Sequence, residues 1–130
     1  MSQAKNDLVK EHVKIPDQEY DQRLQRAITA AGQADLDILL VNSNEADFAN
    51  VRYFSGYWTL FEIAGVAIAP STSKAALLIG PESGTYARDR SKLPRIHKML
   101  EYRESADPAY PGVSVSNFKQ VFDDLGVDVC

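Results

Sequence analysis

Cysteine is almost absent from this chain, because Cys130, the last of its 130 residues, is the only one. A disulfide framework within the chain is therefore excluded, and the composition favours a reducing compartment. No apolar run approaches the roughly 18 residues of a membrane span, and the opening MSQAKNDLVKEHVK lacks the apolar core of a signal peptide. We therefore expect a cytoplasmic protein without a membrane partner.

An excess of basic residues is also lacking. The chain has 14 Lys and Arg against 18 Asp and Glu, so its net charge is -4, and a general attraction to nucleic acid is excluded. The 45% of hydrophobic residues is typical of a globular protein, and the length suits one domain with its own core. We expect residues 1–14 to form a flexible leader and residues 15–130 to form this domain.

Residues that carry chemistry are scarce. His12 and His97 are the only histidines, and neither stands in a metal-binding motif. No glycine-rich phosphate loop is present, and Ser83 is displaced from the middle of a G-x-S-x-G pattern. The residues therefore predict no catalytic group, metal site or cofactor in this chain.

An amphipathic helix is predicted to begin at Pro16, which suits a first turn, and to end at Gly32. Its apolar residues recur with helical spacing: Tyr20, Leu24, Ala27, Ile28 and Ala31. After it, Ile38 to Val41 form a continuous apolar run, typical of a strand covered on both faces. We therefore place this strand at the centre of a sheet and expect Leu39 and Leu40 to be among the most buried residues.

The next segments indicate a mixed sheet. Residues 63–69 and 75–79 are two apolar runs joined by a polar connection, which predicts a hairpin. A helical turn is expected at 50–54, and a short helix capped by Ser83 or Thr85 is expected to end at Arg90.

The C-terminal part continues the alternation. A strand is predicted at 96–102, and a last helix is predicted from the spacing of Phe118, Val121, Phe122 and Leu125. Ser114 or Ser116 is the expected cap of that helix, Gly126 its end, and residues 127–130 the start of another strand. The fold class is therefore α/β, with a mixed β-sheet flanked by helices.

A cluster of aromatic residues follows the first predicted strand. Five of the chain's twelve aromatic residues lie within nine positions: Tyr53, Phe54, Tyr57, Trp58 and Phe61. We expect the first two to lie in the core. Trp58 and Phe61 suit either the core or a contact surface, since exposed aromatic residues are typical of contact surfaces.

The order of these segments resembles the N-terminal domain of creatinase/prolidase-type proteins. The similar stretches are EYDQRLQRA, LDILLVNS, NVRYFSGY, IAGVAIAPSTSKAALLIGPES and YARDRSKLP. The most telling is the segment from Asn50 to Gly56, because the family carries Asn-x-x-Tyr-Phe/Leu-Ser/Thr-Gly just after the first strand. The resemblance implies a ribonuclease H-like topology.

The resemblance also implies a division of labour. In the family, a C-terminal catalytic domain of the pita-bread fold binds two divalent metal ions, manganese, cobalt or zinc, and hydrolyses bonds next to proline or a C–N bond. The N-terminal domain is non-catalytic, forms a homodimer and contributes loop residues to the partner's pocket. The resemblance therefore implies a candidate substrate-pocket or subunit-interface loop that comprises Arg52, Tyr57, Trp58, Phe61 and Glu62. We therefore expect the N-terminal domain of a Xaa-Pro dipeptidase or aminopeptidase P-like metallohydrolase, with proline-containing peptides as the parent's substrates and without the catalytic domain.

A second hypothesis is a stand-alone module that binds a small ligand or peptide through the aromatic loop at residues 57–61. A third hypothesis, an independent hydrolase that uses Cys130 or His97, has little support, since no base is evident beside a nucleophile.

Overall fold

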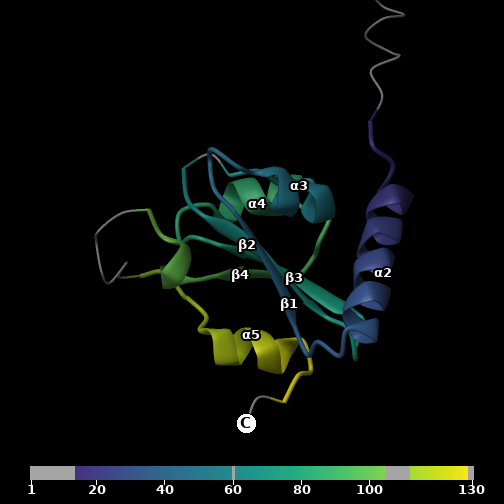
Figure 1. Ribbon diagram of the computed structural model, residues 1–130. Helices are drawn as coiled ribbons and strands as arrows, with labels where there is room; N and C mark the ends of the chain where they lie inside the picture. Colours follow the sequence, from purple (N-terminus) through teal and green to yellow (C-terminus); the bar gives the residue numbers. More distant parts are fainter. Residues whose placement is uncertain (1–13, 60, 105–111, 129–130) are drawn as a thin grey trace, which may run out of the picture.

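The computed structural model describes residues 14–59, 61–104 and 112–128. Most of the predicted leader, the prolines of the 105–112 loop and Cys130 lie outside the described residues. Within them the chain forms one four-stranded sheet in the order β1-β2-β3-β4 (Figure 1). The strands are β1 (Leu39–Ser43), β2 (Ala64–Ala69), β3 (Lys74–Ile79) and β4 (Ile96–Lys98). Neighbours are antiparallel except β3 and β4, which are parallel, so the predicted mixed sheet is confirmed.

Helices cover both faces of this sheet. The helices are α2 (Asp17–Gln33), α3 (Ala49–Ser55), α4 (Gly84–Arg90) and α5 (Phe118–Asp124), with a 3-10 turn, η1 (Leu100–Tyr102). In Figure 1, α3 and α4 lie above the sheet and α5 lies below it. This confirms the predicted α/β class. None of the described helices combines the length and the apolar character that crossing a membrane requires.

The two faces have separate cores because side chains alternate along β2 and β3. On the first face, Val66 and Leu77 pack with Val51 of α3 and with α2 and α4. On the second face, Leu78 packs with Val121 of α5. Both central strands are therefore buried on both sides, and the predicted hairpin that joins them is confirmed.

The prediction for the first strand was wrong. Strand β1 pairs with β2 alone in the described part of the chain, so it lies at an edge and not at the centre. Leu40 is 37% exposed and Leu39 is only partly buried. A run of apolar residues does not distinguish an edge strand from a central one, because pairing on the second side depends on other segments.

Helix α2 begins after Pro16, as predicted, but does not end at Gly32. It continues to Gln33, and Asp35 takes the left-handed conformation with φ 57°. Aspartate tolerates that conformation better than most residues. The predicted strand at 96–102 is also shorter, because the chain turns into η1 after three residues of β4.

The cap of α5 is Asn117, not Ser114 or Ser116. The Asn117 side chain accepts a hydrogen bond from the Gln120 backbone N–H, and the Gln120 side chain accepts one from the Asn117 N–H. This reciprocal pair is a capping box, so both backbone donors at the helix start are satisfied. Gly126, with φ 77°, follows the end of the helix as predicted.

Candidate functional site

The aromatic loop, residues 57–63, connects α3 to β2, and its residue 60 lies outside the description. Tyr57 and Glu62 are 2% and 1% exposed, whereas Phe61 is 38% exposed. Two of the five candidate residues are therefore core residues. The expectation that Tyr53 is buried was wrong, because it is 42% exposed and stacks on Arg23 at 4.4 Å.

Trp58 lies between two helices. Its ring meets the ring of Tyr86 from α4 edge-on, with 6.3 Å between the centroids. The Arg52 guanidinium from α3 lies 4.7 Å from the centroid of the Trp58 ring, and 5.9 Å from that of Phe48. Edge-to-face and cation–π contacts of this kind each contribute about 0.5–1.5 kcal/mol, so they favour one position for the indole.

Trp58 and Arg52 line a cleft of about 610 Å³ that we call the basic cleft. Its lining residues are Lys14, Ile15, Tyr20, Arg52, Gly56, Trp58, Asp89, Arg90 and Lys92. Gly56, with φ 74°, ends α3, and a side chain there would press on the Tyr20 hydroxyl. The cleft therefore forms where α2, the end of α3 and the end of α4 meet.

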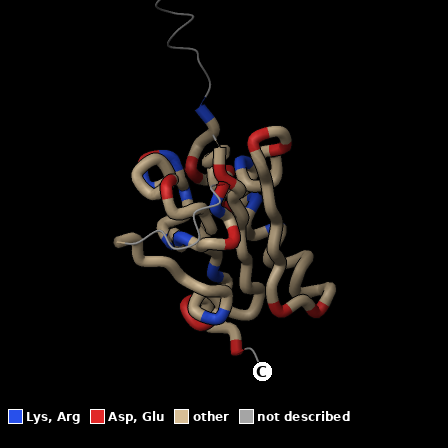
Figure 2. Tube along the Cα trace, turned by 90° about the vertical axis from the view of Figure 1, so that its left-hand side faces the viewer, with Lys and Arg blue, Asp and Glu red and all other residues tan. Residues whose placement is uncertain are grey.

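Positive charge dominates this cleft although the whole chain is acidic. Lys92 pairs with Asp17 at 2.8 Å and Arg90 pairs with Asp89 at 3.2 Å. Arg52 forms no ion pair within the described ranges. Figure 2 shows acidic and basic segments intermixed along the trace, so the cleft is a local feature. An uncommitted guanidinium beside an indole suits an anionic group with a flat or apolar part.

Glu62 belongs to the aromatic loop, and its side chain is buried. Its Oε1 accepts a hydrogen bond from Ser83 Oγ at 2.6 Å and one from the Glu82 backbone N–H at 3.2 Å. Its Oε2 is buried and has no partner among the described residues. Burial raises the pKa of this carboxyl above its ordinary value, although the Ser83 hydrogen bond opposes the shift.

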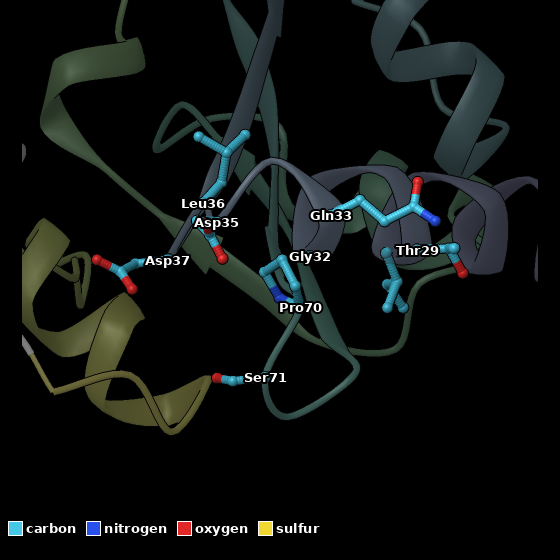
Figure 3. A pocket seen from close by; sticks show the side chains of 9 residues that line it. Thr29, Gly32, Gln33, Asp35, Leu36, Asp37, Pro70 and Ser71 are labelled. Carbon is cyan, nitrogen blue, oxygen red and sulfur yellow. The ribbon is translucent and has the colours of Figure 1, made fainter.

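A second hollow, of about 670 Å³, lies beside the end of α2 and the turn between β2 and β3. It contains the acidic residues Asp35 and Asp37. Figure 3 shows that the side chains do not converge, since Asp37 and Gln33 point to opposite sides. This hollow therefore offers no common binding point for a ligand.

Ser116, His97 and Asp124 form a row of hydrogen bonds beside β4. The His97 ring nitrogens lie 2.9 Å from Ser116 Oγ and 2.9 Å from Asp124 Oδ2. Asp124 Oδ1 also accepts a hydrogen bond from Arg95 at 2.9 Å. These are the residue types of a hydrolase triad, but Asp124 is shared between His97 and Arg95, and the row joins α5 to β4. We interpret it as a structural attachment.

Sequence reasoning found only part of the site. It selected Arg52 and Trp58, but it did not select Arg90 or Lys92, and it placed Tyr20 only on the apolar face of the predicted helix. The partners of Glu62 were also missed, because Ser83 lies 21 positions away and was interpreted only as a helix cap. GPES lies between the predicted strand at 75–79 and the predicted short helix that ends at Arg90, and nothing in this setting indicates that the turn is buried.

Metal binding has no evident place in the described part of the chain. There, no three His, Cys, Asp or Glu side chains are close enough to hold an ion.

A comparison with protein-family models places these features in context. No curated protein matches the chain significantly. The family model of the creatinase/prolidase N-terminal domain matches residues 23–129, a range that includes most of α2, the whole sheet, the aromatic loop and α5. The chain therefore belongs to the creatinase/prolidase N-terminal domain family.

Proposed function

We propose that this chain is the non-catalytic N-terminal domain of a Xaa-Pro dipeptidase or aminopeptidase P-like metallohydrolase. In this role it pairs subunits and shapes the substrate pocket of a catalytic domain that binds the metal ions. The family match supports the domain type. The observation that carries the pocket role is the position of Trp58 and Arg52 together on the wall of the basic cleft.

The chemistry of the cleft agrees with a peptide substrate. A peptide presents a carboxylate at its end, and the Arg52 guanidinium provides paired N–H donors that match a carboxylate. The Trp58 ring provides a flat apolar surface for a proline ring or a neighbouring side chain. Arg52 and Trp58 would therefore orient the substrate, and the bond would be cleaved in the other domain.

The kinetics of the full-length parent test this role. We expect Trp58→Ala to lower turnover or substrate affinity, with fold and metal content unchanged. We expect Arg52→Ala to raise KM about tenfold for substrates with a free carboxylate, which corresponds to one charge-assisted hydrogen bond. Leu36→Ala is the matched control, because Leu36 is 44% exposed and lines the other hollow.

Wild-type kinetics in both variants would contradict the pocket role. The domain assignment has its own tests. A coding sequence that stops directly after codon 130 would contradict it, and light scattering of the parent would show whether it is a homodimer.

A stand-alone binding module is the second candidate, and the volume of the basic cleft favours it. Such a module gains thermal stability from a free ligand, because binding to the folded state alone raises the free energy of unfolding. A screen of small carboxylates and short peptides by thermal shift separates the two functions. A clear shift with the isolated chain supports the module, and no shift supports the excised domain.

A further inference from the structure

The wall of the basic cleft includes the first residues that the structure describes. Lys14 and Ile15 line the cleft, although they precede α2 and belong to no helix or strand. Ile15 is 44% exposed, so an apolar side chain lies open there. In Figure 1 the described chain enters α2 at the end that is level with α3. Residues 1–13 are therefore joined directly to the wall of the cleft.

Pro16 separates these residues from α2. Proline lacks a backbone N–H and disfavours the helical conformation of the residue before it. Pro16 has φ -67° and ψ 151°, which is an extended conformation, and Lys14 and Ile15 are not helical. Helix α2 therefore does not extend backwards past Pro16, and an extended approach of the preceding segment to the cleft is favoured.

The preceding sequence has a two-residue pattern that suits an extended segment. Alternate side chains of an extended chain lie on the same side. One side of residues 7–13 carries acidic and apolar residues only: Asp7, Val9, Glu11 and Val13. The other side carries Leu8, Lys10 and His12. Glu11 is three residues before Lys14, so it lies at most about 11 Å along the chain from the wall of the cleft.

The cleft complements the acidic and apolar side. Of the nine residues that line it, four are basic and one, Asp89, is acidic. Arg52 forms no ion pair within the described ranges, and its guanidinium lies 4.7 Å from the centroid of the Trp58 ring. A guanidinium donates paired hydrogen bonds to a carboxylate, and an indole offers an apolar surface to an aliphatic side chain. Alternating acidic residues and valines therefore fit this wall.

We propose that residues 7–13 of this chain dock in its own basic cleft, with Glu11 paired to Arg52 and a neighbouring valine packed against Trp58. Docking covers the two side chains proposed to orient the substrate, so the segment is a built-in competitor for that site. This competition rests on the proposed function, but docking itself does not. Docking is tested on the isolated chain, so its failure leaves the role in the parent enzyme untouched.

Trp58 is the only tryptophan, so quenching of its fluorescence by acrylamide measures how far the cleft is covered. The purified 130-residue chain is compared with Glu11→Lys at low and high salt, and far-UV circular dichroism verifies the fold. Glu11→Lys places a cation beside Arg52, so the quenching constant should rise about twofold, the size of effect expected of one exposed ion pair. High salt should also raise it in the wild type, because screening weakens the pair.

His12→Lys is the matched control. It introduces the same side chain one position later, on the opposite side of the extended segment, so the quenching constant should stay at the wild-type value. A charge swap makes the test specific to Arg52. In an Arg52→Glu background, adding Glu11→Lys restores an opposite pair, so it should lower the quenching constant, the reverse of its effect in the wild type.

Equal quenching in the wild type and Glu11→Lys, or an equal rise in His12→Lys, would overturn the proposal. Quenching that depends on protein concentration would also overturn it, because the occupant would then be a second copy of the chain. If Arg52→Glu does not fold, the comparison of Glu11→Lys with His12→Lys decides.

Discussion

Two carboxyl groups attach peripheral elements to opposite faces of the sheet, and their pKa values are shifted in opposite directions. Glu62 attaches the aromatic loop on the face of α3 and α4, and burial raises its pKa. Asp124 attaches α5 on the other face, and the hydrogen bond from His97, with help from Arg95, lowers its pKa. The buried Glu62 carboxyl is therefore favoured in its neutral form, and the paired Asp124 carboxyl is favoured in its ionised form.

The difference follows from what surrounds each group. Asp124 is 37% exposed and has two cationic or potentially cationic partners, so its charged form is solvated and paired. Glu62 is 1% exposed and forms no ion pair with any residue that the structure describes. A polar attachment near solvent can use charge, whereas a polar attachment inside the core must avoid it.

The largest effects are expected from adjacent residues of β3 that face opposite cores. Leu77→Ala and Leu78→Ala each remove a side chain that is fully buried, so each should lower the free energy of unfolding by about 2–5 kcal/mol. Leu40→Ala, at the exposed edge, should cost less than about 1 kcal/mol. Chemical denaturation measures all three, and a much smaller loss for either β3 variant would show that its face is not a true core.

Gly80→Ala is expected to disturb the aromatic loop but not the packing of α5. The new methyl group would overlap the Glu62 carboxyl, which must then move, and overpacking of this kind costs about 1–3 kcal/mol. Trp58 emission should change along with stability. Gly32→Ala is the control, because its nearest neighbour would be Pro70 Cβ at 3.9 Å, and a neutral or slightly stabilising effect is expected. If the two variants lost the same free energy of unfolding, the contact between Gly80 and the Glu62 carboxyl would not explain the effect.

Asn117→Ala disturbs the α5 side. Loss of the capping box should lower the free energy of unfolding by about 1 kcal/mol, with no change in Trp58 emission. Ser114→Ala, at the position expected from the sequence, is the control and should behave as wild type. Thermal unfolding measures both variants. A larger loss of stability in Ser114→Ala than in Asn117→Ala would favour the cap that was predicted from the sequence.

Asp124→Asn is expected to have the smallest effect, about 1 kcal/mol or less at neutral pH, because solvent screens a partly exposed pair. The folded-state pKa of Asp124 is lowered, so its contribution is present above the ordinary aspartate range and is lost as the pH falls through the folded-state value. The variant should therefore lose less stability than the wild type on acidification. Asp123→Asn, which disrupts only an exposed pair with Lys119, should keep the wild-type acid profile.

Local patterns predicted most of the secondary structure. The apolar spacing from Tyr20 to Ala31 predicted α2, and the two apolar runs around residues 70–74 predicted the hairpin. Both patterns succeed because helical and strand periodicity depend only on residues close in the sequence. Trp58 and Arg52 were selected because aromatic residues concentrated in a loop indicate a contact surface, and the structure places both on the wall of the basic cleft. Their role in a substrate pocket stays a prediction.

The amino-acid sequence by itself determined the α/β class, the hairpin and the aromatic character of one loop. Only the tertiary structure decided that β1 lies at an edge and that Tyr57 and Glu62 are buried while Phe61 is not. It also decided that the Ser83 hydroxyl donates a hydrogen bond to Glu62 and does not cap α4. The reason is physical. Periodicity is a property of neighbouring residues, whereas burial and the partner of a polar group depend on which distant segments pack together.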